Sequence, residues 1–302
     1  IIGKKYFYFA ISLIIIIPGI VSLILFGLNL SIDFTGGSRI TLSYPIKVSS
    51  QTVKDVKETF NSEKIKMSTV ERSNKLVIIR TTPLSQKQHS QLVSAFKKRS
   101  KDIKWEQFET IGPTIGKETA ENAIKAVLLA SILIVVYIAW SFRKVPKPAS
   151  SFRFGVCAII ALIHDILVVV GVFSILGHFF GVEVDSLFVT GILTVIGFSV
   201  HDTIVVFDRI RENLRKLNGI SFDKIVNESI LQTLARSLNT SLTVVLVLIA
   251  LLLFGGESIR WFVVVLLIGI ISGTYSSIFN ASPLLVVWYY SGLLTKRVKY
   301  VY

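Results

Sequence analysis

The sequence is poor in the residues from which most catalytic and metal sites are built. Its single cysteine, Cys157, lies inside an apolar run, which excludes an intramolecular disulfide and favours a packing role. No Ser/His/Asp set, no metal-ligand triad and no phosphate-binding loop stands out. We therefore expect no cofactor other than a coupling ion, and an enzyme is the least expected class.

Acidic residues are also scarce, with 19 Asp and Glu against 33 Lys and Arg, so the formal net charge is +14. A basic chain can bind nucleic acid, but here the Lys and Arg residues lie between apolar runs and in one soluble segment. They do not alternate with aromatic residues. The charge therefore gives no support for a nucleic-acid partner.

Hydrophobic residues, in contrast, make up 52% of the 302 residues, and the mean hydropathy is +0.65. A helix that crosses the hydrocarbon core needs about 20 mostly apolar residues. The first such run contains Pro18 and Gly19 and lacks a small-x-small cleavage pattern, so we interpret it as an uncleaved anchor. Six membrane-spanning helices are predicted, at residues 6–28, 122–142, 154–178, 186–208, 237–256 and 261–290.

The loop charges predict the orientation. Fifteen basic residues fall at the two ends and in the connections after the second and fourth spans, whereas the opposite short loops carry only Arg260. By the positive-inside rule both termini are cytoplasmic, the segment after the first span is outside, and the chain is a multi-pass protein of the cytoplasmic (inner) membrane. The fifteen are Lys4, Lys5, Arg143, Lys144, Lys147, Arg153, Arg209, Arg211, Arg215, Lys216, Lys224, Arg236, Lys296, Arg297 and Lys299.

The outer segment has the pattern of a small folded domain. Alternating and helical periods predict the order strand, helix, strand, strand, helix, strand, with Ser85 and Gln88 as a capping box. This order is the split βαβ, ferredoxin-like arrangement. The predicted fold is thus a polytopic α-helical membrane protein with a ferredoxin-like α+β extracytoplasmic domain between helices 1 and 2. Its parts are residues 1–28, 29–118 and 119–302.

The outer segment shows no catalytic feature. Its one histidine, His89, lies among polar residues and is interpreted as structural. Residues 31–118 contain sixteen Lys and Arg against nine Asp and Glu. This basic surface is either simply solvated or a surface for an unfolded or acidic partner.

Ionisable groups within the spans are the expected functional residues, and we assign five of them to a proton relay: His164, Asp165, His201, Asp202 and Arg236. His164 with Asp165 lies near the middle of the third span, and His201 with Asp202 lies in the inner half of the fourth. Such groups cost at least about 2.5–3.5 kcal/mol each when unpaired, so they are functional candidates by default. Arg236, at the inner end of the fifth span, is predicted to reach Asp202 by snorkelling. The alternative is an ion pair that only pins the helices together.

Five motifs resemble the SecD/SecF family of bacterial protein export, and within it the smaller, SecF-type component. The resemblance covers essentially the whole chain, and each motif falls on its expected element. They are "IDFTGGSRI" after the first span, "ALIHDILVVVGVFSILG" in the third, "LTVIGFSVHDTIVVFDRIREN" in the fourth, "TLARSLNTSLT" into the fifth and "SGTYSSIFNASPLL" in the sixth.

The resemblance implies a function. Family members belong to the resistance-nodulation-division superfamily and use the proton motive force, with SecD, to promote late-stage translocation of unfolded polypeptides through SecYEG. YidC is a further candidate partner. The resemblance links Asp202 and Arg236 to proton passage. His201 stands where many relatives have Asn, which leaves open whether the relay has an additional proton site.

Two smaller motifs have structural interpretations. Asp33, Gly36 and Gly37 of the "DFTGG" motif are predicted to form the turn after the first span, with glycines at positive φ. Small residues recur every fourth position in the sixth span, and we expect them to allow tight packing within the bundle. These are Gly269, Gly273, Ser277 and Ala281.

Three alternatives stay open. Sodium could replace the proton, since a carboxylate and hydroxyls such as that of Thr203 suit both ions. A solute efflux pump of the same superfamily is disfavoured because the later outer loops hold only about ten residues each. The third alternative is an assembly factor or sensor without transport, which the intramembrane charges disfavour.

Overall fold

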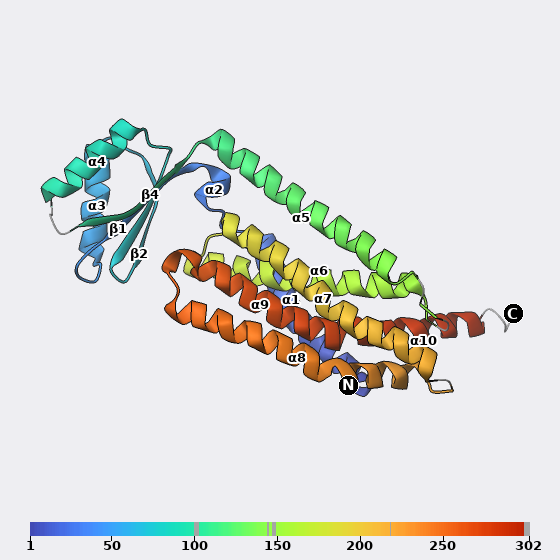
Figure 1. Cartoon of the computed structure of the whole chain (residues 1–302). Helices are drawn as coiled ribbons and strands as arrows, with labels where there is room; N and C mark the ends of the chain where they lie inside the picture. Colours follow the sequence, from blue (N-terminus) through green and yellow to red (C-terminus); the bar gives the residue numbers. More distant parts are fainter. Residues whose placement is uncertain (100–102, 144, 147–148, 218, 299–302) are drawn as a thin grey trace. The chain divides into compact units, whose positions relative to one another are not determined.

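The computed structural model describes residues 1–99, 103–143, 145–146, 149–217 and 219–298. The chain divides into two compact units, one formed by Ile1–Asn29 with Lys125–Tyr302 and the other by Leu30–Ile124. The chain thus leaves the helical unit after its first helix and returns to it within α5 (Figure 1).

In the part of the chain that the structure describes, six helices are long and apolar enough to cross a membrane, as the hydropathy predicted. The first five are Ile2–Phe26, which comprises η1 (Ile2–Lys4) and α1 (Lys5–Phe26), then α5 (Pro113–Ser141), α6 (Ser151–Phe180), α7 (Ser186–Lys216) and α8 (Phe222–Phe254). After the short η2 (Glu257–Ile259), the sixth begins as α9 (Arg260–Ser276), passes through the π-helical η3 (Ser277–Ala281) and continues as α10 (Ser282–Val298).

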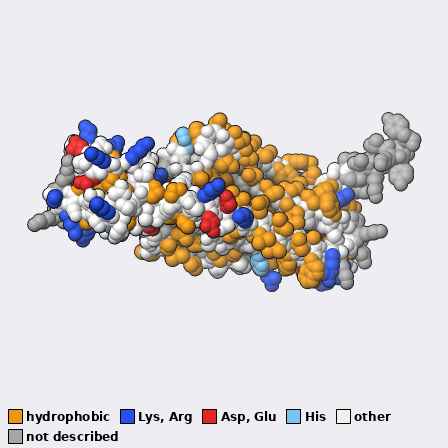
Figure 2. All heavy atoms as spheres, turned by 90° about the horizontal axis from the view of Figure 1, so that it is seen from above, with side chains coloured by type: hydrophobic (Ala, Val, Ile, Leu, Met, Phe, Trp, Pro, Cys, Tyr) orange, Lys and Arg blue, Asp and Glu red, His pale blue; other side chains and the backbone are white. Residues whose placement is uncertain are grey.

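Helices α6, α7 and α9 form the centre of the helical unit. Helix α7 packs on α9, α6 packs on α1 and α9, and α8 packs on α7 and α9. The outward surfaces of α1, α5 and α8 carry many exposed apolar side chains. Figure 2 shows apolar side chains over much of the visible face of the helices. An apolar exterior of this kind suits hydrocarbon as the solvent.

The ends of several spans differ from the sequence predictions. Helix α7 continues to Lys216 and α8 begins at Phe222, so most of the expected cytoplasmic loop after residue 208 is helical. Helix α5 begins at Pro113 rather than at residue 122. The helices are longer than the predicted apolar spans because an apolar run ends where the hydrocarbon ends, whereas the backbone hydrogen bonds of a helix continue into water. Of the basic residues used for orientation, Lys144, Lys147 and Lys299 lie outside the described residues.

The unit Leu30–Ile124 holds an antiparallel sheet of four described strands in the order β2-β3-β1-β4. Its elements follow the predicted order of strands and helices, after the short helix α2 (Ile32–Thr35). Apolar side chains of both longer helices share one core with Ile40, Leu42 and Ile79 of the sheet. These elements are β1 (Gly37–Ser43), α3 (Ser50–Ser62), β2 (Met67–Ser73), β3 (Leu76–Thr81), α4 (Gln86–Arg99) and β4 (Lys104–Ile111).

The ring of His89 packs against two aromatic side chains and is not fully solvated. Its ring stacks on Phe108 at 3.9 Å between centroids and meets Trp105 edge-on at 5.2 Å. Burial lowers the pKa of His89 below its ordinary value, so the ring is neutral at pH 7. The predicted capping box is also present, because Ser85 and Gln88 each accept a hydrogen bond from the other's backbone N–H.

The "DFTGG" turn has the predicted backbone. Gly36 has φ of 70° and Gly37 has φ of 127°, both in the region that favours glycine. A Cβ on Gly36 would also lie 2.8 Å from the Cα of Pro113. Asp33 lies in α2, where its N–H donates to the Ser31 side chain. The motif therefore shapes the chain where it enters β1.

Candidate ion-coupling site

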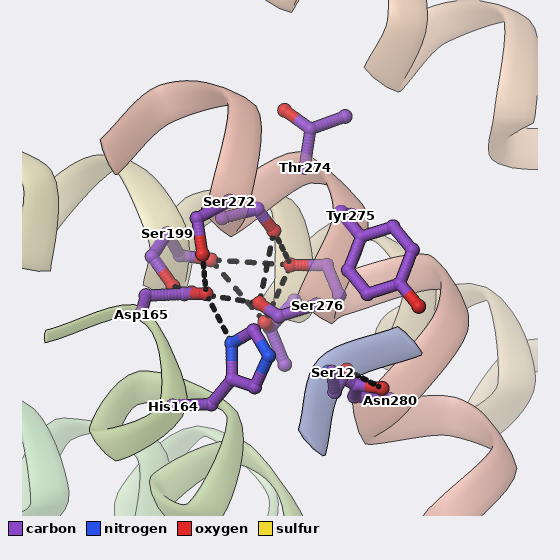
Figure 3. A network of polar contacts seen from close by, with 12 residues as sticks. Ser12, His164, Asp165, Ser199, Ser272, Thr274, Tyr275, Ser276 and Asn280 are labelled. Atoms are coloured by element: carbon purple, nitrogen blue, oxygen red, sulfur yellow. Dashed lines mark hydrogen bonds and ion pairs between the residues drawn. The ribbon is translucent and has the colours of Figure 1, made fainter. Parts of the chain in front are cut away.

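Asp165 of α6 accepts hydrogen bonds at both of its carboxylate oxygens. It is 0% exposed and accepts from the hydroxyls of Ser199 at 2.5 Å, Ser272 at 2.7 Å and Ser276 at 2.7 Å. His164 Nδ1 lies 2.9 Å from its Oδ1. Figure 3 shows the serines and His164 converging on Asp165.

The donors around Asp165 come from three helices. Ser272 and Ser276 are four residues apart on α9, so they lie on one face, and Ser199 reaches the carboxylate from α7. Each oxygen of Asp165 therefore has two neighbours: Oδ2 has Ser199 and Ser276, and Oδ1 has Ser272 and His164. This carboxylate ties α6, α7 and α9 together.

Asp202 of α7 has a different environment. It is 2% exposed, and its Oδ2 accepts from Thr274 of α9 at 3.2 Å and from Ser241 of α8 at 3.4 Å. The hydroxyls of Ser241 and Thr274 are themselves 2.5 Å apart. Both bonds to Asp202 are longer than those to Asp165, so its carboxylate is held less tightly. A proton or small cation would meet fewer competing donors here.

The two carboxylates are joined through α7 and α9. The Thr203 and Ser277 hydroxyls are 2.8 Å apart, and Ser199, four residues before Thr203, bonds to Asp165. Thr274 of α9 bonds to Asp202, whereas its neighbours Ser272 and Ser276 bond to Asp165. A displacement of α9 would therefore alter both sites together.

Small residues allow this close contact of α7 and α9. A Cβ on Gly269 would lie 2.1 Å from Val195 Cγ2, and one on Gly273 would lie 3.1 Å from the Cα of Ser199. With Ser277 of η3 bonded to Thr203, every fourth residue from Gly269 to Ser277 meets every fourth residue of α7. The prediction of tight packing within the bundle is confirmed for Gly269, Gly273 and Ser277.

The π-helical segment η3 begins directly after Ser276. Such segments often mark functional sites, because one extra residue turns the following side chains to a different face. Here Asn280 Nδ2 donates to Ser12 Oγ of α1 at 2.8 Å, and Ser12 Oγ lies 3.0 Å from Asn280 Oδ1. The sixth span thus presents Ser276 to Asp165 and Asn280 to α1.

The structure brings together only part of the predicted relay. His201 is exposed beside buried Asp202, and Arg236 is exposed on α8. Within the described part of the chain, no hydrogen bond or ion pair joins Arg236 to Asp202, although the two were predicted to meet. The buried face of α8 includes Ser237 and Ser241, and Arg236, one residue before Ser237, points about 100° away.

The hydroxyl ligands of the two carboxylates were not identified from the sequence. Ser and Thr are common in membrane helices, where they bond to the carbonyl four residues earlier, so hydroxyls alone give a weak signal. The spacing of Ser272 with Ser276 was the available clue. Among the residues that the structure describes, no cluster of three or more His, Cys, Asp and Glu could hold a metal ion.

Comparison with known proteins gives two family matches. Residues 91–291 match the model of the "Protein export membrane protein SecD/SecF, C-terminal" family, and residues 21–44 match the "SecD/SecF GG Motif". The second match contains Asp33, Gly36 and Gly37.

Similar proteins include two named protein translocase subunit SecF. That of Thermobaculum terrenum is 49% identical and that of Anaerolinea thermophila 46%, and each match covers 95% of this chain and 93% of the relative. The SecDF of Bacillus subtilis is 37% identical over 95% of this chain and 37% of its own length.

A solved structure gives a similar result. The crystal structure of SecDF from Thermus thermophilus, described as a translocon-associated membrane protein, has a TM-score of 0.83 and 34% identity. The match covers 95% of this chain and 38% of that one, so this chain spans about two-fifths of a SecDF chain.

Proposed function

Because this chain belongs to the SecD/SecF family of protein-export membrane proteins, we propose that its buried carboxylates couple ion flow to protein export. It acts as the SecF-type subunit of the Sec machinery and, with SecD, uses the proton motive force to promote late-stage translocation. The observation that carries the coupling role is Asp202, buried in a membrane-spanning helix and bonded to neutral hydroxyls. An asparagine at this position tests it, as argued in the Discussion.

SecD is the partner that the relatives indicate, since SecD and SecF parts form one chain in SecDF proteins. We propose that SecD docks on the polar faces of α7 and α8. Exposed polar or small residues are unfavourable against lipid, but they suit contact with another helix. The α7 face consists of Thr190, Thr194, Gly197 and His201, and the α8 face of Arg236, Asn239, Thr240 and Thr243.

A tryptophan at Gly197 is expected to weaken SecD binding strongly. A Cβ at Gly197 meets nothing within 4 Å, so the chain itself can accept the side chain, whereas a docked helix could not. We expect co-purification of tagged SecD with Gly197→Trp to fall at least about tenfold, equal to about 1.4 kcal/mol of binding free energy. Leu133→Trp on α5, at a 59% exposed apolar position, is the matched control. Equal recovery of SecD with both variants would contradict this docking face.

The unit Leu30–Ile124 is proposed to be the extracytoplasmic domain predicted for residues 29–118, with a ferredoxin-like fold. The strand order and the shared core of α3 and α4 support this assignment. Its basic surface would meet unfolded exported chains beside SecYEG, with YidC as a further partner. Both termini would then be cytoplasmic and the bundle would lie in the inner membrane.

Labelling of single cysteines tests this orientation. In a Cys157→Ser background, Lys98→Cys should react with an impermeant maleimide added outside whole cells, and Lys216→Cys should react only after permeabilisation. Both lysines are exposed, so accessibility to solvent does not limit either reaction. If Lys216→Cys reacted from outside at the rate of Lys98→Cys, the orientation would be wrong.

Proton exchange at Asp202 depends on its surroundings. Burial disfavours a charged carboxylate and a nearby arginine favours it, so an approach of Arg236 would change the proton affinity of the site. We propose that Arg236, exposed on α8, approaches Asp202 only in another state of the complex. The coupling ion is the proton, with sodium as the alternative. His201, exposed beside Asp202, is proposed as an additional proton site of the relay.

A further inference from the structure

The buried negative charge of Asp165, in the pair His164–Asp165, is not neutralised by its described hydroxyl partners. Asp165 is fully buried, and its described partners are three neutral hydroxyls and the imidazole of His164. Hydroxyl donors reduce the cost of a buried negative charge but do not neutralise it. The one partner that can supply a positive charge is His164.

The hydrogen bonds indicate which nitrogen of His164 would accept a proton. With Asp165 ionised and both of its oxygens accepting from serine hydroxyls, His164 Nδ1 donates to Oδ1. In the neutral imidazole this leaves Nε2 as a bare lone pair. Nε2 is buried and has no hydrogen-bond partner among the described residues.

His164 also lines a groove in the helical unit. The groove has a volume of about 330 Å³ and lies between α1, α6 and the segment of η3 and α10. It is mostly apolar, but Ser12 and Asn280 line it together with His164. The Ser12 and Asn280 side chains bond to each other, so neither is a hydrogen-bond partner of His164 Nε2. Figure 3 shows the Ser12–Asn280 pair beyond the His164 ring from Asp165.

We propose that His164 Nε2 is a second proton-binding atom of the bundle. The proton binds to the Nε2 lone pair, Nδ1–H remains bonded to Asp165 Oδ1, and the charge of the pair changes from −1 to zero. This site is separate from Asp202, which bonds to other residues. The role of this site in transport rests on the proposed ion coupling. The experiment below tests proton binding by His164 itself, so it does not depend on that proposal.

The other groups around His164 do not compete for this proton. On α9, Tyr275 stacks 6.4 Å from the ring and its hydroxyl donates to the carbonyl of Tyr8 on α1. Helix α1 and η3 contribute the uncharged Ser12 and Asn280, and α10 contributes Leu284. Helix α7 contributes Ser199, while its Asp202 faces Ser241 and Thr274.

Nitrogen NMR of the histidine side chains tests the proposal directly. The sequence contains only four histidines, so labelling this chain alone with ¹⁵N-histidine, in a complex with unlabelled SecD in lipid nanodiscs, gives a small set of signals. His164→Gln assigns the His164 signals, and His178→Gln on the same helix is the matched control. Between pH 5 and 9 we expect Nε2 to change from a bare acceptor to N–H while Nδ1 stays protonated throughout.

Further variants separate this site from Asp202. Asp202→Asn should leave the His164 titration unchanged, and Asp165→Asn should remove it because the imidazolium loses its counter-charge. The proposal is overturned if Nε2 keeps one protonation state over the whole range, or if Asp202→Asn abolishes the change. Normal export by Asp202→Asn would contradict the coupling role of Asp202 while leaving the His164 result intact, so the two failures can be distinguished.

Discussion

Asp202→Asn is expected to abolish the stimulation of protein export by the membrane potential while leaving the fold intact. Asparagine keeps the oxygen that accepts from Thr274 and Ser241, so the contacts of α7 with α8 and α9 are preserved. It cannot bind and release a proton. One proton crossing 100 mV supplies about 2.3 kcal/mol, which corresponds to a shift of about 50-fold between two conformations. Without the free energy of this proton transfer, potential-dependent export should fall by up to about 50-fold.

The measurement is late-stage export into vesicles that contain SecYEG and SecD, at several imposed potentials, together with ion conduction. Asp208→Asn is the control on the same helix, because Asp208 is exposed and pairs with Arg211 rather than with a buried group. We expect Asp208→Asn to export like the parent. If Asp202→Asn assembled with SecD and exported at the parental rate at every potential, Asp202 would be a packing residue. Repeating the conduction assay with sodium in place of a proton gradient distinguishes the two ions.

Gly171→Ala is expected to destabilise the helical unit clearly. A Cβ at Gly171 would lie 2.7 Å from the Cα of Gly19 and 3.1 Å from its carbonyl carbon. These are backbone atoms, so no side-chain rotation relieves the clash, and α1 must move away from α6. The movement would also strain the bond between the Ser22 and Ser174 hydroxyls, now 2.9 Å. Overpacking of this kind costs about 1–3 kcal/mol.

Thermal unfolding of the purified protein in detergent measures this effect. Gly155→Ala lies on the same helix, and its Cβ would meet nothing within 4 Å, so it controls for the general effect of replacing glycine in α6. We expect Gly171→Ala to unfold at a clearly lower temperature than Gly155→Ala. Equal unfolding temperatures would show that α1 and α6 separate without cost. Because lipid does not drive helices together, close backbone packing is a main source of their association.

Much of the fold could be predicted from the sequence because two physical rules act on short stretches of it. The thickness of the hydrocarbon core makes each span a long apolar run, and six helices were correctly expected. Local backbone chemistry predicted the positive φ of Gly36 and Gly37 and the capping box of Ser85 and Gln88. The cost of charge in lipid marked Asp165 and Asp202 as special before any contact was known.

The ends of the helices were predicted less accurately than their number, because the sequence signals that mark helix ends are weaker. The last turns of α7, which ends at Lys216, are rich in charged residues. There Glu212 pairs with Arg209 and Lys216 on one face of the helix. The π-helical turn in the sixth span left no periodic signal strong enough to be recognised. It nevertheless decides that Asn280 meets Ser12 of α1.

The sequence by itself determined the number of spans, the elements of the strand-containing unit and the ionisable residues of the bundle, since each depends on neighbours along the chain. Only the tertiary structure decided how those residues are used. Three serines from two other helices converge on Asp165, whereas Asp202 has two long bonds and, among the described contacts, none to Arg236. Such differences depend on which helix faces are buried together, because side chains far apart in the sequence then become the nearest donors.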